Sequence, residues 1–238
     1  RYDFTFIGNT LNPSENNNST PSFLLTSSSA TLNLSSDDRI ERAYLYWAGS
    51  GSGDANVKLN GFDITPDQLS NVTGSFSNFT YFSAFKDITL LVQSIGNGTY
   101  TLSDFDINNL VATYATNATQ FAGWAILIVY ENPNLTLNQI NIYQGLEALS
   151  PNPFVIPAII DNMEIQLDNL YLISNTGAKI GFIAWEGDRL IQESERLSFS
   201  ANGTTTILSN PLNPGNNAFN GTHTETNATN LFNMDLDV

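Results

Sequence analysis

Short apolar runs, broken by glycine, proline and asparagine, dominate the order of residues along the chain. Residues 43–48 and 123–130 are apolar or aromatic almost throughout, and the second run predicts a central strand buried on both faces. Other runs alternate polar and apolar residues, the pattern of a strand with one solvated face. These alternating runs are residues 56–60, 139–143 and 164–167. Residues 179–185 predict a further strand that is largely buried.

Helical patterns are few and short. They lie at residues 85–92 and 188–195, and neither has a long apolar stripe of helical period. Turn signals recur about every ten residues, which favours an all-β fold: an antiparallel β-sandwich or jelly roll with long loops and few short helices. The proline- and asparagine-rich segments 151–153 and 210–214 separate no second core, so we predict a single domain over residues 1–238.

The charge balance excludes several kinds of partner. The 238 residues include 23 Asp and Glu against 8 Lys and Arg, a formal net charge of −15. Such a surface repels nucleic-acid phosphates and anionic lipid. The longest apolar run, 121–130, is half as long as a membrane-spanning helix, so no membrane insertion is expected. The chain has no Cys, which excludes disulfides, thiol chemistry and Cys-based zinc sites.

Candidates for catalysis are sparse. A Ser-His-Asp triad would need His223, the only histidine, but this residue lies in a polar segment and is interpreted as a solvated loop side chain. Paired carboxylates could support glycoside hydrolysis, with Glu131, Glu164, Glu186 and Asp188 as candidates. No spacing in the sequence fixes such a pair at a catalytic separation, so no enzymatic activity is predicted.

Trp185, Glu186 and Asp188 form a candidate ligand-binding set. An aromatic side chain followed by two acids can stack on a sugar and accept its hydroxyl hydrogen bonds. The alternative is that the two acids end a strand and face water.

Calcium is the metal that the composition favours. Asp104, Asp106 and Asn108 have the alternate-oxygen spacing that opens many calcium loops, although the glycine and distant glutamate of an EF-hand are missing. A strand gives the same spacing without a metal. Lys and Arg are also missing from 87–178 and after 197, so many carboxylates have no nearby cation. No cofactor is required by these patterns, and a structural Ca²⁺ is the candidate.

Residues 1–21 are predicted to form an extended arm. Tyr2, Phe4 and Phe6 alternate with other residues, and a flexible stretch follows them. Such an arm can add as a strand to the sheet edge of a neighbouring subunit and build a homopolymer. The opening residues 1–3 show no signal peptide and resemble a mature or trimmed end.

Eight segments in register carry a resemblance that spans nearly the whole chain. They are residues 1–10, 43–51, 81–89, 121–133, 141–146, 177–188, 216–222 and 233–238. Together they resemble the amino-terminal region of large cell-surface proteins of Bacteroidetes, a group that includes gliding-motility adhesins exported by the type IX secretion system. The resemblance implies an extracellular, surface-anchored β-rich module and no catalytic residues. The repeats and sorting region of the longest family members have no counterpart in this sequence.

These observations lead us to expect a non-enzymatic cell-surface adhesin or surface-filament module that mediates attachment or gliding-type contact. Its expected partners are surface glycans or other cell-surface proteins, met by the loops at 49–53, 151–157 and 210–220. A self-polymerising filament subunit and a calcium-dependent carbohydrate-binding module remain the alternatives.

Overall fold

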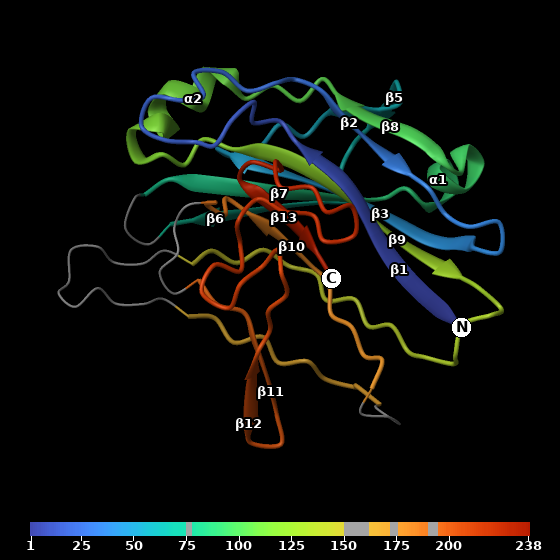
Figure 1. Cartoon of the computed structure of the whole chain (residues 1–238). Helices are drawn as coiled ribbons and strands as arrows, with labels where there is room; N and C mark the ends of the chain where they lie inside the picture. Colours follow the sequence, from blue (N-terminus) through green and yellow to red (C-terminus); the bar gives the residue numbers. More distant parts are fainter. Residues whose placement is uncertain (75–77, 150–161, 172–175, 190–194) are drawn as a thin grey trace.

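Two antiparallel sheets and a lobe of long loops form three layers (Figure 1). The computed structural model describes residues 1–74, 78–149, 162–171, 176–189 and 195–238. The large sheet has the strand order β1-β9-β3-β7-β6, and the small sheet the order β2-β8-β4-β5. The lobe, built mainly from residues after 132, lies against the other face of the large sheet. The chain is therefore an all-β, sandwich-like protein, as the sequence predicted.

The large sheet consists of β1 (Tyr2–Thr10), β3 (Arg39–Ser50), β6 (Gln68–Thr73), β7 (Thr80–Asp87) and β9 (Ala122–Glu131). The small sheet consists of β2 (Ser28–Leu32), β4 (Val57–Leu59), β5 (Phe62–Ile64) and β8 (Gly98–Ser103). The short helices are α1 (Thr89–Ile95), α2 (Asn108–Tyr114) and the 3₁₀ turn η1 (Ala115–Asn117). The lobe contains β10 (Phe182–Trp185), β11 (Ser198–Ala201), β12 (Thr204–Ile207) and β13 (Met234–Asp237).

Strand β9 confirms the prediction of a central buried strand. It pairs with β1 on one side and β3 on the other. Alternate side chains point to opposite faces of a strand. Trp124 and Ile126 therefore join the core between the two sheets, whereas Ala125 and Leu127 join a second core beneath the lobe. Since both faces are covered, neither set of positions is polar.

Several predicted elements differ in the structure. The predicted helix 85–92 is replaced by the end of β7 and by α1, because residues up to Asp87 pair with β3. The predicted strands 139–143 and 164–167 form no ladder: the two segments are joined by side chains, as where Tyr143 Oη donates to the Asp168 carbonyl at 2.6 Å. The strand predicted at 179–185 is observed only at 182–185.

Two further predictions concern residues that lie partly or wholly outside the described part of the chain. The helix predicted at 188–195 includes residues 190–194, which lie outside the described residues, and Glu195 pairs in a β-bridge with Asn217. The whole loop at 151–157 also lies outside the described part of the chain. Across that described part, no helix is both long and apolar enough to cross a bilayer.

Strand β1 corrects the prediction of a free arm over residues 1–21. It pairs with β9 of its own chain over its whole length, with Tyr2 opposite Glu131 and Thr10 opposite Gly123. Phe4 and Phe6 pack against the second core, so the alternation seen in the sequence reflects burial beneath the lobe.

The outward edge of β1 is also occupied. The Asn138 side chain hydrogen-bonds both the amide and the carbonyl of Tyr2. Further along, Lys179 Nζ donates to the Phe4 carbonyl at 3.0 Å, and Glu225 accepts the Phe6 amide at 3.1 Å. These side chains take the hydrogen bonds that an added strand would need, and so protect the edge.

Candidate functional site

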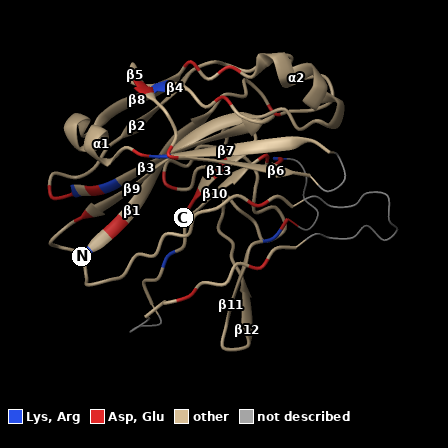
Figure 2. Ribbon diagram, turned by 180° about the vertical axis from the view of Figure 1, so that it is seen from behind, with Lys and Arg blue, Asp and Glu red and all other residues tan. Residues whose placement is uncertain are grey.

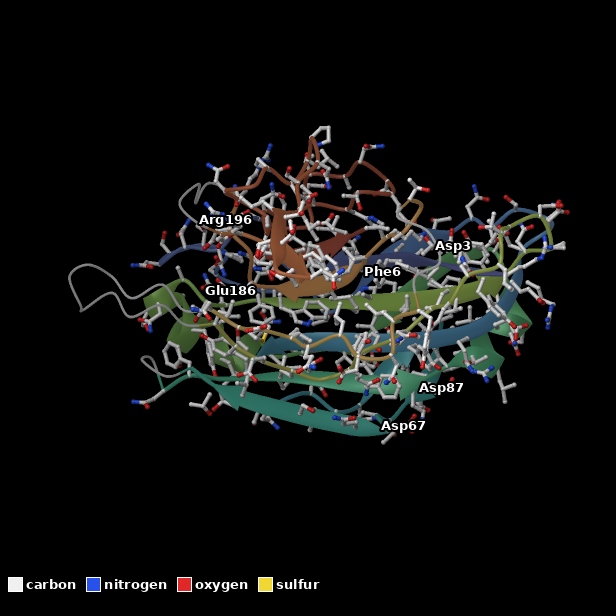
Figure 3. All side chains as sticks on the ribbon, turned by 90° about the horizontal axis from the view of Figure 1, so that it is seen from below. Asp3, Phe6, Asp67, Asp87, Glu186 and Arg196 are labelled. Atoms are coloured by element: carbon white, nitrogen blue, oxygen red, sulfur yellow. The ribbon has the colours of Figure 1, made fainter. Side chains whose placement is uncertain are left out.

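A cluster of acidic side chains lies in the lobe, close to the large sheet. We call it the acid cluster, and it consists of Glu15, Glu186, Asp188, Glu195 and Asp235. Pairing of β10 with β13 brings its sequence-distant members together, with Trp185 opposite Met234. Figure 3 places Glu186 where the lobe meets the large sheet, far from Asp67 and Asp87 at the other end of the molecule.

Backbone geometry sets the position of Glu186. Its amide donates to the Asn233 carbonyl at 2.7 Å, which extends the β10–β13 pairing by one step. Its φ of 68° is left-handed, a conformation that costs free energy in a residue other than glycine. The turn leads into Gly187, where an added Cβ would lie 2.6 Å from the Phe219 carbonyl oxygen and 2.7 Å from Asp235 Oδ2. Only glycine therefore fits between these two oxygens.

Burial makes the charged form of each cluster member unfavourable. Desolvation is the main cause that raises the pKa of Asp235 to about 7, of Glu195 to about 7 and of Asp188 to about 6. The pKa of Glu186 is raised well above its usual range, first by desolvation of its carboxyl group and then by repulsion from Asp188. Desolvation also raises the pKa of Glu15, partly offset by the amide and charge of Arg189.

Mutual repulsion shows that the carboxylates are close to one another. Asp188 and Asp235 both contribute to the raised pKa of Glu195, and Glu15 contributes to that of Asp188. Within the described residues, the ion pairs lie elsewhere, for example between Lys86 and Asp67 at 2.6 Å. Figure 2 shows how few basic positions the ribbon carries beside its acidic ones. The acid cluster is thus a concentration of carboxyl groups with little compensating positive charge among the described residues.

Asp235 is half satisfied by hydrogen bonds. The residue has 0% exposure. Its Oδ1 accepts the main-chain amides of Asn220 at 3.0 Å and Thr222 at 2.9 Å. Its Oδ2 is buried, and no donor among the described residues reaches it. The neighbouring Asp237 differs, because it accepts hydrogen bonds through both carboxylate oxygens.

Three asparagines beside Asp235 likewise have one hydrogen-bonded and one unpaired side-chain atom. Asn213, Asn217 and Asn220 are all buried. Each amide nitrogen donates to protein oxygens, as where Asn217 Nδ2 donates to the Arg189 carbonyl at 3.0 Å. This use of the nitrogens fixes the orientation of the amides. Each Oδ1 is buried without a donor. Unpaired buried oxygens are costly, so their grouping here requires an explanation.

The predicted ligand-binding set is partly assembled. Glu186 and Asp188 both belong to the acid cluster, and repulsion between them confirms that they are close. Trp185 packs against the second core and lies near Gly123, where an added Cβ would meet its ring at 3.2 Å. Its ring is therefore used in docking the lobe onto the sheet.

The predicted calcium segment lies elsewhere, beside the small sheet. Asp104 forms an ion pair with Lys58. Asp106 accepts the Asn108 amide at 2.9 Å and also its side-chain nitrogen at 2.9 Å, in the loop that leads into α2. The alternating oxygens of this segment therefore have hydrogen-bond and ion-pair partners within the protein.

The remaining catalytic candidates are separate from the acid cluster. His223 corrects the interpretation as a solvated side chain: it is only 3% exposed, its Nε2 lies 3.2 Å from the Phe6 carbonyl, and burial lowers its pKa. Glu131 pairs with Arg39 at 2.5 Å. Glu164 is exposed in a loop.

Sequence reasoning missed Glu15, Glu195 and Asp235 as members of a site. Two signals were present: the Asn-rich stretch 210–220 and the Asp-x-Asp spacing at Asp235 and Asp237. Neither reveals that residues 15, 195 and 235 meet, because their approach depends on how the lobe folds back.

Oxygen ligands of this type suit a hard cation. Among the described residues, no three acidic or histidine side chains already converge in metal-binding geometry. A cation held here would need amide and main-chain oxygens beside its carboxylates, a mixture typical of calcium sites. In comparisons with known proteins, no family model, no curated protein and no solved structure matched the chain.

Proposed function

We propose that this chain is a non-enzymatic binding module of a cell surface, an adhesin or a component of a surface filament. The observation that carries the proposal is the placement of the acid cluster. Its carboxylates pack against main-chain amides and amide side chains, and Asp235 has no exposed surface. A catalytic acid must meet its substrate, so the complete burial of Asp235 favours a structural or binding role for this residue, whereas Glu186 and Asp188 are half-buried.

Two hollows on the described surface are consistent with the same proposal. One is lined by residues that include Leu34, Arg39 and Asn97, and another by residues that include Ile64, Lys86 and Leu90. Neither hollow is lined by a member of the acid cluster. These two hollows and the acid cluster therefore lie in different places.

Exposed apolar side chains on the lobe offer a contact surface. Tyr171 and Leu137 are each 76% exposed, and Ile165 is 60% exposed. They lie in two extended segments, 135–149 and 162–171, which hydrogen bonds such as that from Gln139 Nε2 to the Asn169 carbonyl hold together. Grouped exposed apolar and aromatic residues are typical of binding surfaces. We call these three side chains the lobe patch.

The experiment measures attachment with and without the lobe patch. Fluorescent beads coated with the full chain are presented to a glycan array and to bare glass, since many copies per bead amplify weak contacts. We expect attachment that is lost in a Tyr171→Ser, Ile165→Ser double variant. The matched control is Phe62→Ser on β5, where the side chain is 56% exposed but lies away from the lobe. Attachment no greater than that of uncoated beads would contradict the proposal.

A calcium-dependent carbohydrate-binding module is the second candidate, favoured by the unpaired oxygens beside Asp188 and Glu195. It predicts that binding to the glycan array falls when calcium is chelated. Binding that persists in chelator assigns recognition to the lobe patch alone.

A further inference from the structure

The unexplained feature of the lobe is a group of buried oxygens without donors. They are Asp235 Oδ2, Glu195 Oε2 and the Oδ1 atoms of Asn213, Asn217 and Asn220. Each of these atoms is an acceptor, and each belongs to the segment 195–220 or to β13. Five neighbouring acceptors without donors differ from ordinary packing, in which buried polar groups are nearly always paired. A bound cation satisfies several oxygen acceptors at once and needs no donor hydrogen.

Connections within the lobe place the residues that carry these oxygens next to one another. The carboxylate of Glu195 accepts the Phe219 amide, and its backbone bridges to Asn217. The Phe219 carbonyl and Asp235 Oδ2 lie within 2.6 and 2.7 Å of the same point at Gly187. Glu195, Asn217, Phe219 and Asp235 therefore form one continuous arrangement.

We propose that the lobe binds a Ca²⁺ ion, with the side-chain oxygens of Asp235, Glu195 and Asn217 and the carbonyl oxygen of Phe219 as its first ligands. Asn213 and Asn220 stand next to them with free oxygens. Calcium accepts carboxylate, amide and main-chain oxygens together, in a coordination number of about six to eight. Magnesium demands a stricter octahedron and keeps its waters, which an enclosed site of mixed ligands does not favour. Zinc prefers nitrogen and sulfur ligands, and neither is part of this set.

Charge supports a divalent ion. Asp188 and Glu186 stand near Glu195, and their repulsion is among the causes that disfavour ionisation. A divalent cation would turn this repulsion into attraction and lower the pKa values of all the carboxylates that face it. The proposal is independent of what the protein adheres to, because it concerns ion binding alone.

The test measures calcium binding by the full chain after treatment with EGTA and dialysis. Isothermal titration with CaCl₂ should give saturable binding of about one ion per chain, and about 1 mM CaCl₂ should raise the Tm by about 5 °C or more. The same concentration of MgCl₂ should raise it less. The absence of both heat and shift, or equal shifts with the two ions, would overturn the proposal.

Variants locate the ion. Glu195→Gln should weaken calcium binding at least about tenfold, because it removes a ligand charge. Asp104→Asn is the matched control, since it removes a carboxylate from the other candidate segment, and it should bind calcium as the wild type does. Unchanged binding in Glu195→Gln, or loss in Asp104→Asn, would refute the assignment.

Folding of the variants is checked by circular dichroism. Asp235 also holds the main chain of Asn220 and Thr222, so Asp235→Asn is a riskier variant. Where it fails to fold, Asn217→Ala replaces it and should weaken calcium binding without a change in the far-ultraviolet spectrum. These readouts use no adhesion assay, so their failure is distinct from failure of the proposed surface role.

Discussion

The β-sandwich and the lobe bury their residues by different means. Between the two sheets, Trp47, Trp124, Tyr100 and Phe82 are almost completely buried in a continuous apolar core. In the lobe, the buried set includes Asn213, Asn217, Asp235 and other polar residues, and the second apolar core is smaller. A hydrophobic core is stable in any buffer, whereas buried carboxylates and amides depend on pH and on bound ions. The sandwich is therefore the scaffold, and the lobe is the part that responds to conditions.

The largest expected effect is a difference in stability between two tryptophan variants, one in each region. Trp124 is fully buried between the sheets and donates to Ser28 Oγ at 2.8 Å. Trp124→Ala should cost about 3–5 kcal/mol of the free energy of unfolding, through lost burial and a cavity. Trp185→Ala, in the partly exposed β10, should cost less than half as much. Urea denaturation measures both, and equal losses would contradict the comparison.

Loss of lobe docking is the next largest effect. Leu236 is 0% exposed and packs in the second core. Leu236→Ala should cost about 2–4 kcal/mol and should loosen the lobe while the sandwich persists. Hydrogen exchange should then show faster exchange in β10 and β13 than in β9. Uniform acceleration in all three strands would mean that the lobe and the sandwich unfold as one unit.

Mildly acidic pH should stabilise the protein when calcium has been removed with EGTA. The folded-state pKa values of Asp235 and Glu195, both about 7, lie above their usual values of 3.8 and 4.5. The folded state thus holds these protons more tightly, and stability is lost as the pH rises through about 7. Asp188, Glu186, Glu15 and Asp237 shift in the same direction, whereas the lowered pKa of the buried His223 favours stability at higher pH and offsets part of the effect.

In EGTA, we expect the Tm to be higher at about pH 5.5 than at about pH 8, by about 5 °C. Calcium should shrink or reverse this difference, because it binds the ionised carboxylates. Differential scanning fluorimetry measures both curves. Asp104→Asn should follow the wild type, and a pH profile unaffected by calcium would argue against an ion in the lobe.

The smallest effect concerns Glu186. In EGTA at about pH 8, Glu186→Gln should raise the Tm by about 2–4 °C, since it removes a desolvated charge and can keep the hydrogen bond from Asn16 Nδ2. On a broad glycan panel, we expect no turnover by the wild type or by this variant. Cleavage by the wild type that the variant lacks would instead favour a glycoside hydrolase.

The sequence predicted the sandwich because local patterns are sufficient for it. Residues 123–130 are apolar at every position except the small Gly123, and this pattern requires a strand covered on both faces. The same reasoning failed for residues 139–143 and 164–167. They alternate like strands, but they form no ladder, and side chains such as those of Gln139 and Tyr143 donate hydrogen bonds to the main-chain carbonyls at 169 and 168 instead. Alternation indicates a strand-like chain and cannot specify its neighbours.

The sequence alone determined that the chain is acidic, free of cysteine and β-rich, with long stretches that contain no Lys or Arg. Only the tertiary structure decided that Glu186 and Asp188 meet Glu195 and Asp235, and that β1 is bound into its own sheet rather than extended as an arm. The physical reason is the separation along the chain of the residues that interact. Hydrophobic periodicity is a property of neighbouring residues, whereas desolvation and repulsion among carboxylates depend on which distant segments the folded chain brings together.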